Sequence, residues 1–202
     1  MSTSKKIINK INGFRRGKPF RSTHFLELGS RAAVDQALSR LVNAGKIKRI
    51  KRGLFVKPEQ NVYVGEVLPG AEEVARFLAR QTGHKLVISG AEAARRFGFT
   101  TQVSSQSVFF TDGPSRNCRL GNHEVRLRHV APRKMALAGR PAGEALRALW
   151  YLGSDEVTPQ TFERIEGRLP PEEFSALTQE QKIMPGWMRN TLSEYQRHQR
   201  SA

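Results

Sequence analysis

The residues of this sequence that could bind a metal ion lie close together in its second half. Cys118, His123 and His129 are the best candidates for metal ligands. Residues 123–129 alternate polar and apolar side chains and predict a single strand, so the two histidines share a face about 20 Å apart, at roughly 3.3 Å per residue. Zinc requires its ligands at about 2 Å. The spacing therefore predicts no metal site.

Acid–base chemistry would require Asp112, His123 and Glu124 to meet in the fold. The sequence contains no phosphate-binding loop, dinucleotide-binding glycine motif, nucleophile elbow, HExxH or CxxC motif. Acids at strand ends and histidines on exposed strands are more often structural than catalytic. The sequence predicts no catalytic residue and no cofactor, and a metal-dependent nuclease is the more distant alternative.

Residues 30–52 predict a different chemistry, which is hydrogen bonding to nucleic acid. On a helix over 30–43, Val34, Leu38 and Leu41 form an apolar stripe, and the opposite face is small, polar and flanked by arginines. Such a face can enter a major groove and reach base edges, while basic side chains at its margins and in the following segment reach phosphates. The residues predicted to contact DNA are Ser30, Arg31, Ala32, Gln36, Ser39, Arg40, Lys48, Arg49, Lys51 and Arg52.

The elements that must position these residues are two helices and a hairpin. Residues 22–29 predict a short capped helix, and Ser30 and Gly45 are suited to begin and end the helix that follows. Residues 46–56 form two β-like runs around a turn in which Gly53 can adopt a positive φ. Helix, turn, helix and basic hairpin predict a winged helix-turn-helix. The alternative is a small helix–hairpin unit whose charges are only solvated.

Positive charge is concentrated in the same part of the chain. The 202 residues include 34 Lys and Arg against 18 Asp and Glu, a net charge of +16. Residues 1–58 contain 15 of the basic and 2 of the acidic residues, so the remainder is nearly balanced. A basic module beside a balanced remainder is typical of a nucleic-acid-binding domain joined to a second domain.

The predicted fold class is α+β, with two domains. Residues 1–58 are predicted to form the winged helix-turn-helix, residues 59–69 an extended connector, and residues 70–202 a small α+β domain. Within the second domain, strands are expected at 85–88, 107–111 and 123–129, and helices at 71–81, 91–97, 143–153, 158–168, 171–177 and around 187–195. The single cysteine excludes an internal disulfide and suits a reducing cytoplasm. No membrane span or signal peptide is predicted, so the expected localisation is cytoplasmic.

A second basic group follows in the predicted second domain. It consists of Arg126, Arg128, Arg133 and Lys134. These residues could contact a partner or nucleic acid. They could equally be the solvated charges of an edge strand, where charge discourages unwanted strand pairing.

The chain resembles the AbiEi-type antitoxins of type IV (abortive infection) toxin–antitoxin systems, and more closely their DUF6088 relatives. The resemblance is carried by LGSRAAVDQALSRLVNAGKIKRIKRGLF at 28–55, VISGAEAARRFGFTTQ at 87–102, VFFTDGPSR at 108–116, APRKMALAGRPAGEALRALWYLG at 131–153 and PGWMRNTL at 185–192. It implies a winged-helix domain joined to an antitoxin domain. It also implies repression of an operon shared with a nucleotidyltransferase-like toxin, which type IV antitoxins need not contact directly.

The expected function is therefore that of a transcriptional repressor and antitoxin whose partners are double-stranded operator DNA and, through the operon, a nucleotidyltransferase-like toxin. The alternative from another class is an RNA-binding or translational regulator. That regulator would tolerate loss of the polar face of the 30–43 helix but would still require the basic residues.

Overall fold

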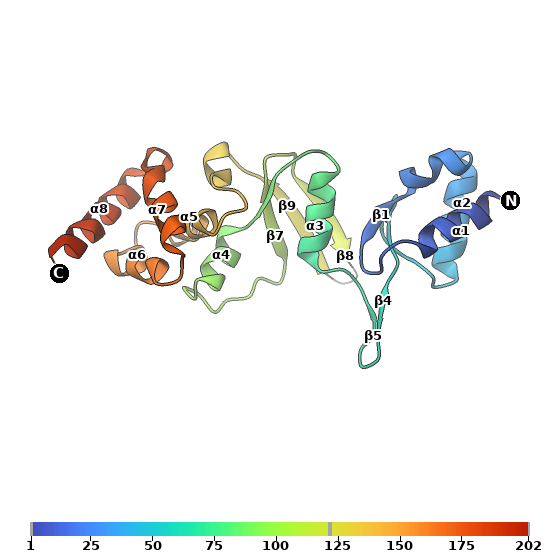
Figure 1. Cartoon of the computed structure of the whole chain (residues 1–202), viewed down its shortest axis with the longest axis horizontal. Coiled ribbons are helices and arrows are strands. Elements are labelled where there is room, and N and C mark those ends of the chain that lie inside the picture. Colours follow the sequence, from blue (N-terminus) through green and yellow to red (C-terminus); the bar gives the residue numbers. More distant parts are fainter. Residues whose placement is uncertain (1, 121–122, 202) are drawn as a thin grey trace. The chain divides into compact units, whose positions relative to one another are not determined.

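The computed structural model describes residues 2–120 and 123–201 of a mixed α and β chain (Figure 1). As far as these ranges are described, the chain forms two compact units, Met1–Gln81 with Asn117–Arg126 and Thr82–Arg116 with Leu127–Ala202. Residues 71–81, which the sequence assigns to the second domain, belong to the first unit. That residues 1–58 fold as a domain of their own stays a prediction.

The first unit begins with helices and a small sheet. Its elements are α1 (Thr3–Asn12), β1 (Pro19–Arg21), the 3₁₀ helix η1 (Ser22–Leu28), α2 (Arg31–Asn43), β2 (Lys48–Lys51), β3 (Leu54–Val56), β4 (Glu59–Asn61), β5 (Gly65–Val67) and α3 (Ala71–Arg80). Strands β1, β3 and β2 form an antiparallel sheet in that order. The short helix expected at 22–29 is thus a 3₁₀ helix.

Local capping and one apolar cluster explain why these helices form and pack. The Ser2 hydroxyl accepts from the amide of Lys5 in α1, and the Ser30 hydroxyl accepts from the amide of Ala33 in α2. Phe25 of η1 is fully buried in the cluster that joins α1, α2 and the sheet. All three residues of β3 are buried because this strand is central in its sheet.

Residues 59–69 are extended, as a connector would be, but their strands pair with each other. Strands β4 and β5 form an antiparallel hairpin in which Glu59 faces Val67 and Asn61 faces Gly65. The Asn61 side-chain oxygen accepts from the amides of Tyr63 and Val64, at 2.8 and 3.2 Å. Such an Asx turn and a glycine at φ +74° close the loop. The hairpin projects from the rest of the first unit (Figure 1).

The rest of the chain contains a second sheet followed by helices. Its elements are β6 (Leu86–Ile88), α4 (Gly90–Arg96), β7 (Ser107–Thr111), β8 (Arg116–Leu120), β9 (His123–His129), the 3₁₀ helix η2 (Pro132–Met135), α5 (Pro141–Leu152), α6 (Pro159–Glu166), α7 (Pro171–Gln179), the 3₁₀ helix η3 (Glu180–Ile183) and α8 (Gly186–Ser201). The sheet order is β6-β7-β9-β8. The sequence did not predict β8, whose short run carries only two buried apolar residues, Cys118 and Leu120.

Helix α5 is the centre of the helical part of the second unit. Nearly every residue from Ala142 to Leu149 is buried, because the helix packs against α4 on one side and α7 on another. Glu173 of α7 accepts from the amide of Ala142 at 3.0 Å and so satisfies a free donor at the start of α5. Among the helices that the structure describes, none has the length and apolar composition that a membrane span requires.

Candidate nucleic-acid interface

Helix α2 places its predicted contact residues on a solvent-exposed face. Its buried side is formed by Val34, Ala37, Leu38 and Leu41. On the other side Arg31, Ala32, Gln36 and Arg40 are exposed, and Ser39 is half-buried. Ser30 is also exposed, but its hydroxyl already caps the helix. The face is therefore available to a partner over more than two turns, with an uncharged amide, Gln36, near its centre.

The two arginines beside Gln36 differ in their surroundings. The Nε of Arg31 donates to the Oδ2 of Asp35 at 3.1 Å, across one turn of the helix. Both side chains are more than half exposed, so the pair is weak and can open when a phosphate approaches. Arg40 is exposed and forms no ion pair with any acid in the described part of the chain.

The β2–β3 hairpin lies next to α2 in sequence and is joined to it by one side chain. The Nη2 of Arg49 donates to the Ser39 hydroxyl at 3.4 Å, and its guanidinium lies over the Phe55 ring at 5.5 Å. The strand pairing is irregular between Arg49 and Lys51, which is the signature of a β-bulge. Arg49 therefore holds β2 against α2, and the same contact occupies the Ser39 hydroxyl.

The other predicted basic residues of this hairpin divide into paired and unpaired groups. Lys48 forms a salt bridge of 2.9 Å with Glu66 of β5. Lys51 and Arg52 form no ion pair with any acid among the described residues, and Arg52 is exposed at the turn. Gly53 follows at φ +74°, as the sequence predicts for this turn. Lys51 and Arg52, with Arg40 on α2, are thus the cations of the predicted interface with no ion pair, side-chain hydrogen bond or ring contact among the described residues, whereas Arg49 contacts Ser39 and Phe55.

Most side chains of the second predicted basic group contact other residues of the chain. It comprises Arg126, Arg128, Arg133 and Lys134. Arg126 pairs with Glu124 at 2.9 Å, and this hydrogen bond is the main reason that the pKa of Glu124 is lowered. Arg133 and Lys134 lie over the ring of Trp150, at 5.1 and 5.7 Å from its centre. Arg128 is exposed on β9. Three of the four cations therefore have partners within the chain.

Several of the residues considered for metal binding or acid–base chemistry have contacts within the chain. Asp112 accepts from the amide of Lys85 at 2.8 Å, and a ring nitrogen of His129 lies 3.1 Å from the carbonyl oxygen of Gly113. Burial raises the pKa of the Cys118 thiol, and the charge of Lys51 opposes this effect more weakly. Within residues 2–120 and 123–201, no three His, Cys, Asp or Glu side chains are grouped to hold a metal ion.

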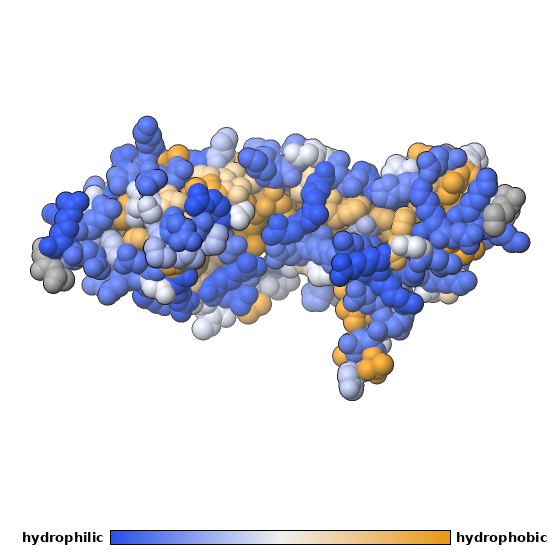
Figure 2. Space-filling view, in the orientation of Figure 1, coloured by the Kyte–Doolittle hydropathy of each residue, from blue (hydrophilic) through white to orange (hydrophobic). Residues whose placement is uncertain are grey.

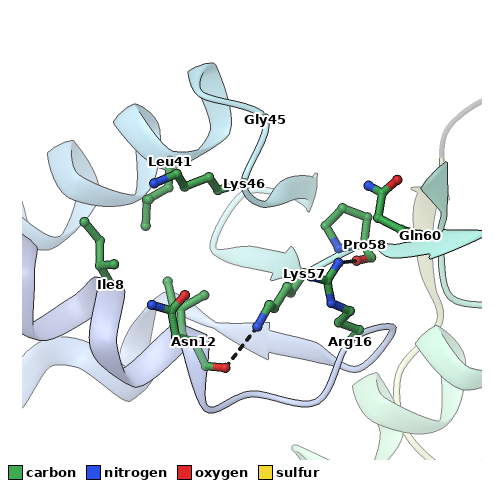
Figure 3. A pocket seen from close by; sticks show the side chains of 10 residues that line it. Ile8, Asn12, Arg16, Leu41, Gly45, Lys46, Lys57, Pro58 and Gln60 are labelled. Carbon is green, nitrogen blue, oxygen red and sulfur yellow. Dashed lines mark hydrogen bonds between the residues drawn. The ribbon is translucent and has the colours of Figure 1, made fainter. Parts of the chain in front are cut away.

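Two features of the first unit were not predicted from the sequence. One is the apolar tip of the β4–β5 hairpin, Val62-Tyr63-Val64, and the other is a recess of about 260 Å³ beside the base of the same hairpin (Figure 3). The available signal was three apolar residues between Asn61 and Gly65 in an otherwise polar stretch. The sequence predicts only an extended connector at 59–69, because this stretch lacks the alternation of two paired strands.

These features define a mixed α and β protein whose basic N-terminal unit presents a polar helix face beside a cationic hairpin. Residues 6–177 match the model of DUF6088, a family of unknown function, and the chain belongs to this family. No curated protein matches the chain. The predicted likeness to DUF6088 is therefore confirmed, and the likeness to AbiEi-type antitoxins stays a prediction.

Proposed function

We propose that this protein is a sequence-specific, DNA-binding transcriptional repressor and that its residues 1–58 form a winged helix-turn-helix. Support comes from the order of its elements, in which α1, β1, η1 and α2 precede the β2–β3 hairpin and the sheet order is β1-β3-β2. In this assignment η1 and α2 are the helix-turn-helix pair, and the β2–β3 hairpin is the wing.

The observation that carries the proposal is the exposed polar face of α2 with arginines at its margins, Arg31 in a weak pair with Asp35 and Arg40 with no ion pair among the described residues. Gln36 can donate and accept at once through its amide, which matches the N6 and N7 groups of adenine in the major groove. Arg31 and Arg40 flank Gln36 on α2, while Lys51 and Arg52 lie at the wing. Their charges would reach phosphates and fix the register, and Gln36 would read sequence.

The regulatory role follows from the resemblance to type IV antitoxins. In this proposal the protein represses its own operon in the cytoplasm, and the operon also encodes a nucleotidyltransferase-like toxin. Arg128 is exposed on β9 and is the member of the second basic group that remains available for a partner or for nucleic acid.

The sheet in the second half of the chain gives little support to the alternative of RNA recognition. Proteins that bind single-stranded RNA on a sheet stack bases on exposed aromatic side chains. Phe109 of β7 is buried at 6% exposure, and Phe110 packs against the cluster of Val87, Val130 and Met135. These rings contribute to the core and offer no stacking platform.

The test compares Gln36→Ala with the wild type on DNA selected by the full chain from a random pool and on unselected DNA of the same length. The variant should lose about 1–3 kcal/mol of discrimination on the selected site if Gln36 contacts an adenine through both amide atoms. Its binding to unselected DNA should change little. Gln181→Ala, in η3 of the second unit, is the matched control and should behave as the wild type on both.

Equal losses on both DNAs would show that α2 does not read sequence. Failure of the wild-type chain to select any duplex, together with tight binding to single-stranded RNA, would reject the proposal in favour of the RNA-binding alternative.

A further inference from the structure

The tip of the β4–β5 hairpin exposes three apolar side chains in succession. Val62 and Tyr63 are each 92% exposed and Val64 is 72% exposed. Figure 2 shows orange, hydrophobic surface beside paler atoms at the end of this projecting hairpin. Single exposed apolar residues are common on protein surfaces, but a contiguous apolar group on a projection marks an interaction site. A tyrosine alone removes about 150–250 Å² from water when it is buried.

We refer to the hairpin Glu59–Val67 as the arm. Its hydrogen bonds and strand pairing hold its tip in one conformation. Three residue pairs form its stem, and Asn61 closes the loop through two hydrogen bonds. At the stem, Glu66 is fixed by its salt bridge to Lys48. Because the tip is already ordered before it meets a partner, less conformational entropy is lost when it binds.

A recess lies beside the base of the arm and is lined by both apolar and polar side chains. Ile8, Ile11 and Leu41 supply its apolar surface, and Gln60 of the arm itself forms part of its wall (Figure 3). Its volume of about 260 Å³ lies below the roughly 300–1,000 Å³ of sites for drug-sized ligands. A space of this size suits one large side chain.

Three cations line this recess, and two of them are hydrogen-bonded to backbone carbonyls. Lys57 donates from Nζ to the carbonyl of Asn12 at 3.0 Å, and Arg16 donates from Nη1 to the carbonyl of Pro58 at 3.4 Å. Lys46 is a third basic residue of its lining and is exposed. The arm has the opposite character, with two acids and no basic residue between Glu59 and Val67.

We propose that two copies of the chain exchange these arms, so that Tyr63 of each copy enters the recess of the other. The tip is almost fully exposed and therefore does not occupy the recess of its own chain. Tyr63 lies in the turn that follows β4, at the opposite end of the arm from Gln60 in the wall of the recess. Two arms lying antiparallel place each tip at the base of the other arm, which is the self-complementary arrangement of a two-fold dimer.

The charges of the arm favour a second copy over DNA as its partner. Between Glu59 and Val67 the arm carries two acids and no basic residue, and phosphates would repel the carboxylate of Glu59, which has no ion pair among the described residues, while Glu66 is paired with Lys48. The contact involves two tips and two recesses, so the buried area falls at or below the low end of standard interfaces, about 1,200 Å² in total. The dimer is therefore a weak one in solution. It does not depend on DNA binding, although it would present two α2 helices to a two-fold symmetric site.

The first experiment is sedimentation equilibrium of the full chain without DNA, from micromolar to submillimolar concentration. The wild type should show a reversible monomer–dimer equilibrium. Tyr63→Ser and the triple variant Val62→Ser/Tyr63→Ser/Val64→Ser should weaken it at least tenfold, with unchanged melting temperature because these side chains are exposed. Val103→Ser removes a 79% exposed apolar residue of the second unit and is the matched control, which should dimerise as the wild type does.

A second experiment locates the contact. A Tyr63→Cys chain mixed with a Lys46→Cys chain should form an intermolecular disulfide under mild oxidation, whereas a Val103→Cys chain mixed with the Lys46→Cys chain should not. A monomeric wild type at all concentrations, or tip variants that dimerise like the wild type, would overturn the proposal. A monomeric wild type whose tip variants lose affinity for DNA would assign the arm to DNA instead and would also overturn it.

Discussion

Arg147 is the residue whose environment departs most from the usual rules of burial. It lies on α5 with only 3% of its surface exposed, and its Nε and Nη1 atoms are buried without a hydrogen-bond partner. Burial lowers the pKa of this guanidinium to about 10, and the charge of Glu144 only partly offsets that effect. The side chain remains charged at neutral pH, so the folded state carries the cost of a desolvated cation.

Replacing Arg147 with methionine should therefore stabilise the protein. A side chain of similar length without a charge removes the desolvation cost, and we expect a gain of about 1–3 kcal/mol in the free energy of unfolding. Because folding lowers the pKa of Arg147, this gain should be constant at pH values below about 10. Urea denaturation at pH 7 and pH 8 measures it.

The matched control is Arg164→Met in α6. Arg164 lies over the ring of Phe99 at 4.7 Å and donates to the carbonyl of Gly98 at 3.0 Å. Its loss should lower stability slightly. If Arg147→Met also lowers stability, then the guanidinium of Arg147 has partners that compensate for its burial.

At the scale of the element, α5 and α7 are connected by a carboxylate. Glu173 accepts from the amide of Ala142 and from the side chain of Arg140, each at 3.0 Å, and its side chain is 15% exposed. These hydrogen bonds, the backbone one first, lower the pKa of Glu173 below its ordinary value. A carboxylate with a lowered pKa stabilises the fold above its ordinary pKa, and this stabilisation is lost as pH falls through the lowered value.

We expect Glu173→Gln to be less stable than the wild type at pH 7 and the difference to shrink as pH falls below about 4.5, the ordinary value for this side chain. Free energies of unfolding from urea titrations at pH 7, 5 and 3.5 test this. Glu156→Gln, at an exposed position before α6, should show no such trend. A difference between Glu173→Gln and wild type that does not depend on pH would mean that the carboxylate charge is not what connects the helices.

The turn of the β2–β3 hairpin is a second element whose geometry can be tested. Gly53 has φ +74°, and its carbonyl accepts from the amide of Ser22 at 3.1 Å, so the turn also fixes the start of η1. Gly53→Val should cost at least 1–2 kcal/mol, about the penalty of a left-handed conformation for an L-residue. Gly53→Asn is the control, because asparagine tolerates this region far better. Thermal melts of both variants measure the difference. Equal melting temperatures for Gly53→Val and Gly53→Asn would show that the positive φ at this position does not limit stability.

At the scale of the whole molecule, charge is distributed unevenly, and DNA affinity should follow that distribution. Neutralised phosphates release counterions, so log affinity should fall linearly with log salt concentration. The triple variant Arg40→Ala/Lys51→Ala/Arg52→Ala should weaken binding on every sequence and reduce the salt slope by up to about three. Fluorescence anisotropy from 50 to 300 mM salt measures the slope.

The control removes the same number of positive charges from the second unit. Lys182, Arg189 and Arg200 are exposed there, and their triple alanine variant should keep the wild-type slope. Both triple variants should melt near the wild-type temperature, since exposed charges contribute little to stability. Equal slopes for the two variants would show that DNA binding is not concentrated in the first unit.

Much of the helical structure and the turn with a positive φ at Gly53 could be predicted from the sequence because their causes are local. Helix hydrogen bonds and caps join residues within four positions of one another, so the spacing of Val34, Leu38 and Leu41 and the cap at Ser30 were sufficient to predict α2 and its exposed face. The mixed α and β class and the concentration of positive charge in residues 1–58 could likewise be predicted from the sequence without knowledge of the tertiary structure.

The tertiary structure alone decided how strands pair and which charges remain free. Strand β1 forms because Phe20 meets Phe55 on β3, 35 residues later, and no local pattern encodes such a pairing. The same holds for Lys48, which appears free in sequence but reaches Glu66 only because the arm folds back as a hairpin. The sequence by itself therefore determined which face of α2 is polar. Contacts within the described part of the chain determined that Lys48 is paired and Arg49 is held by Ser39 and Phe55, whereas Arg40, Lys51 and Arg52 have neither kind of contact there.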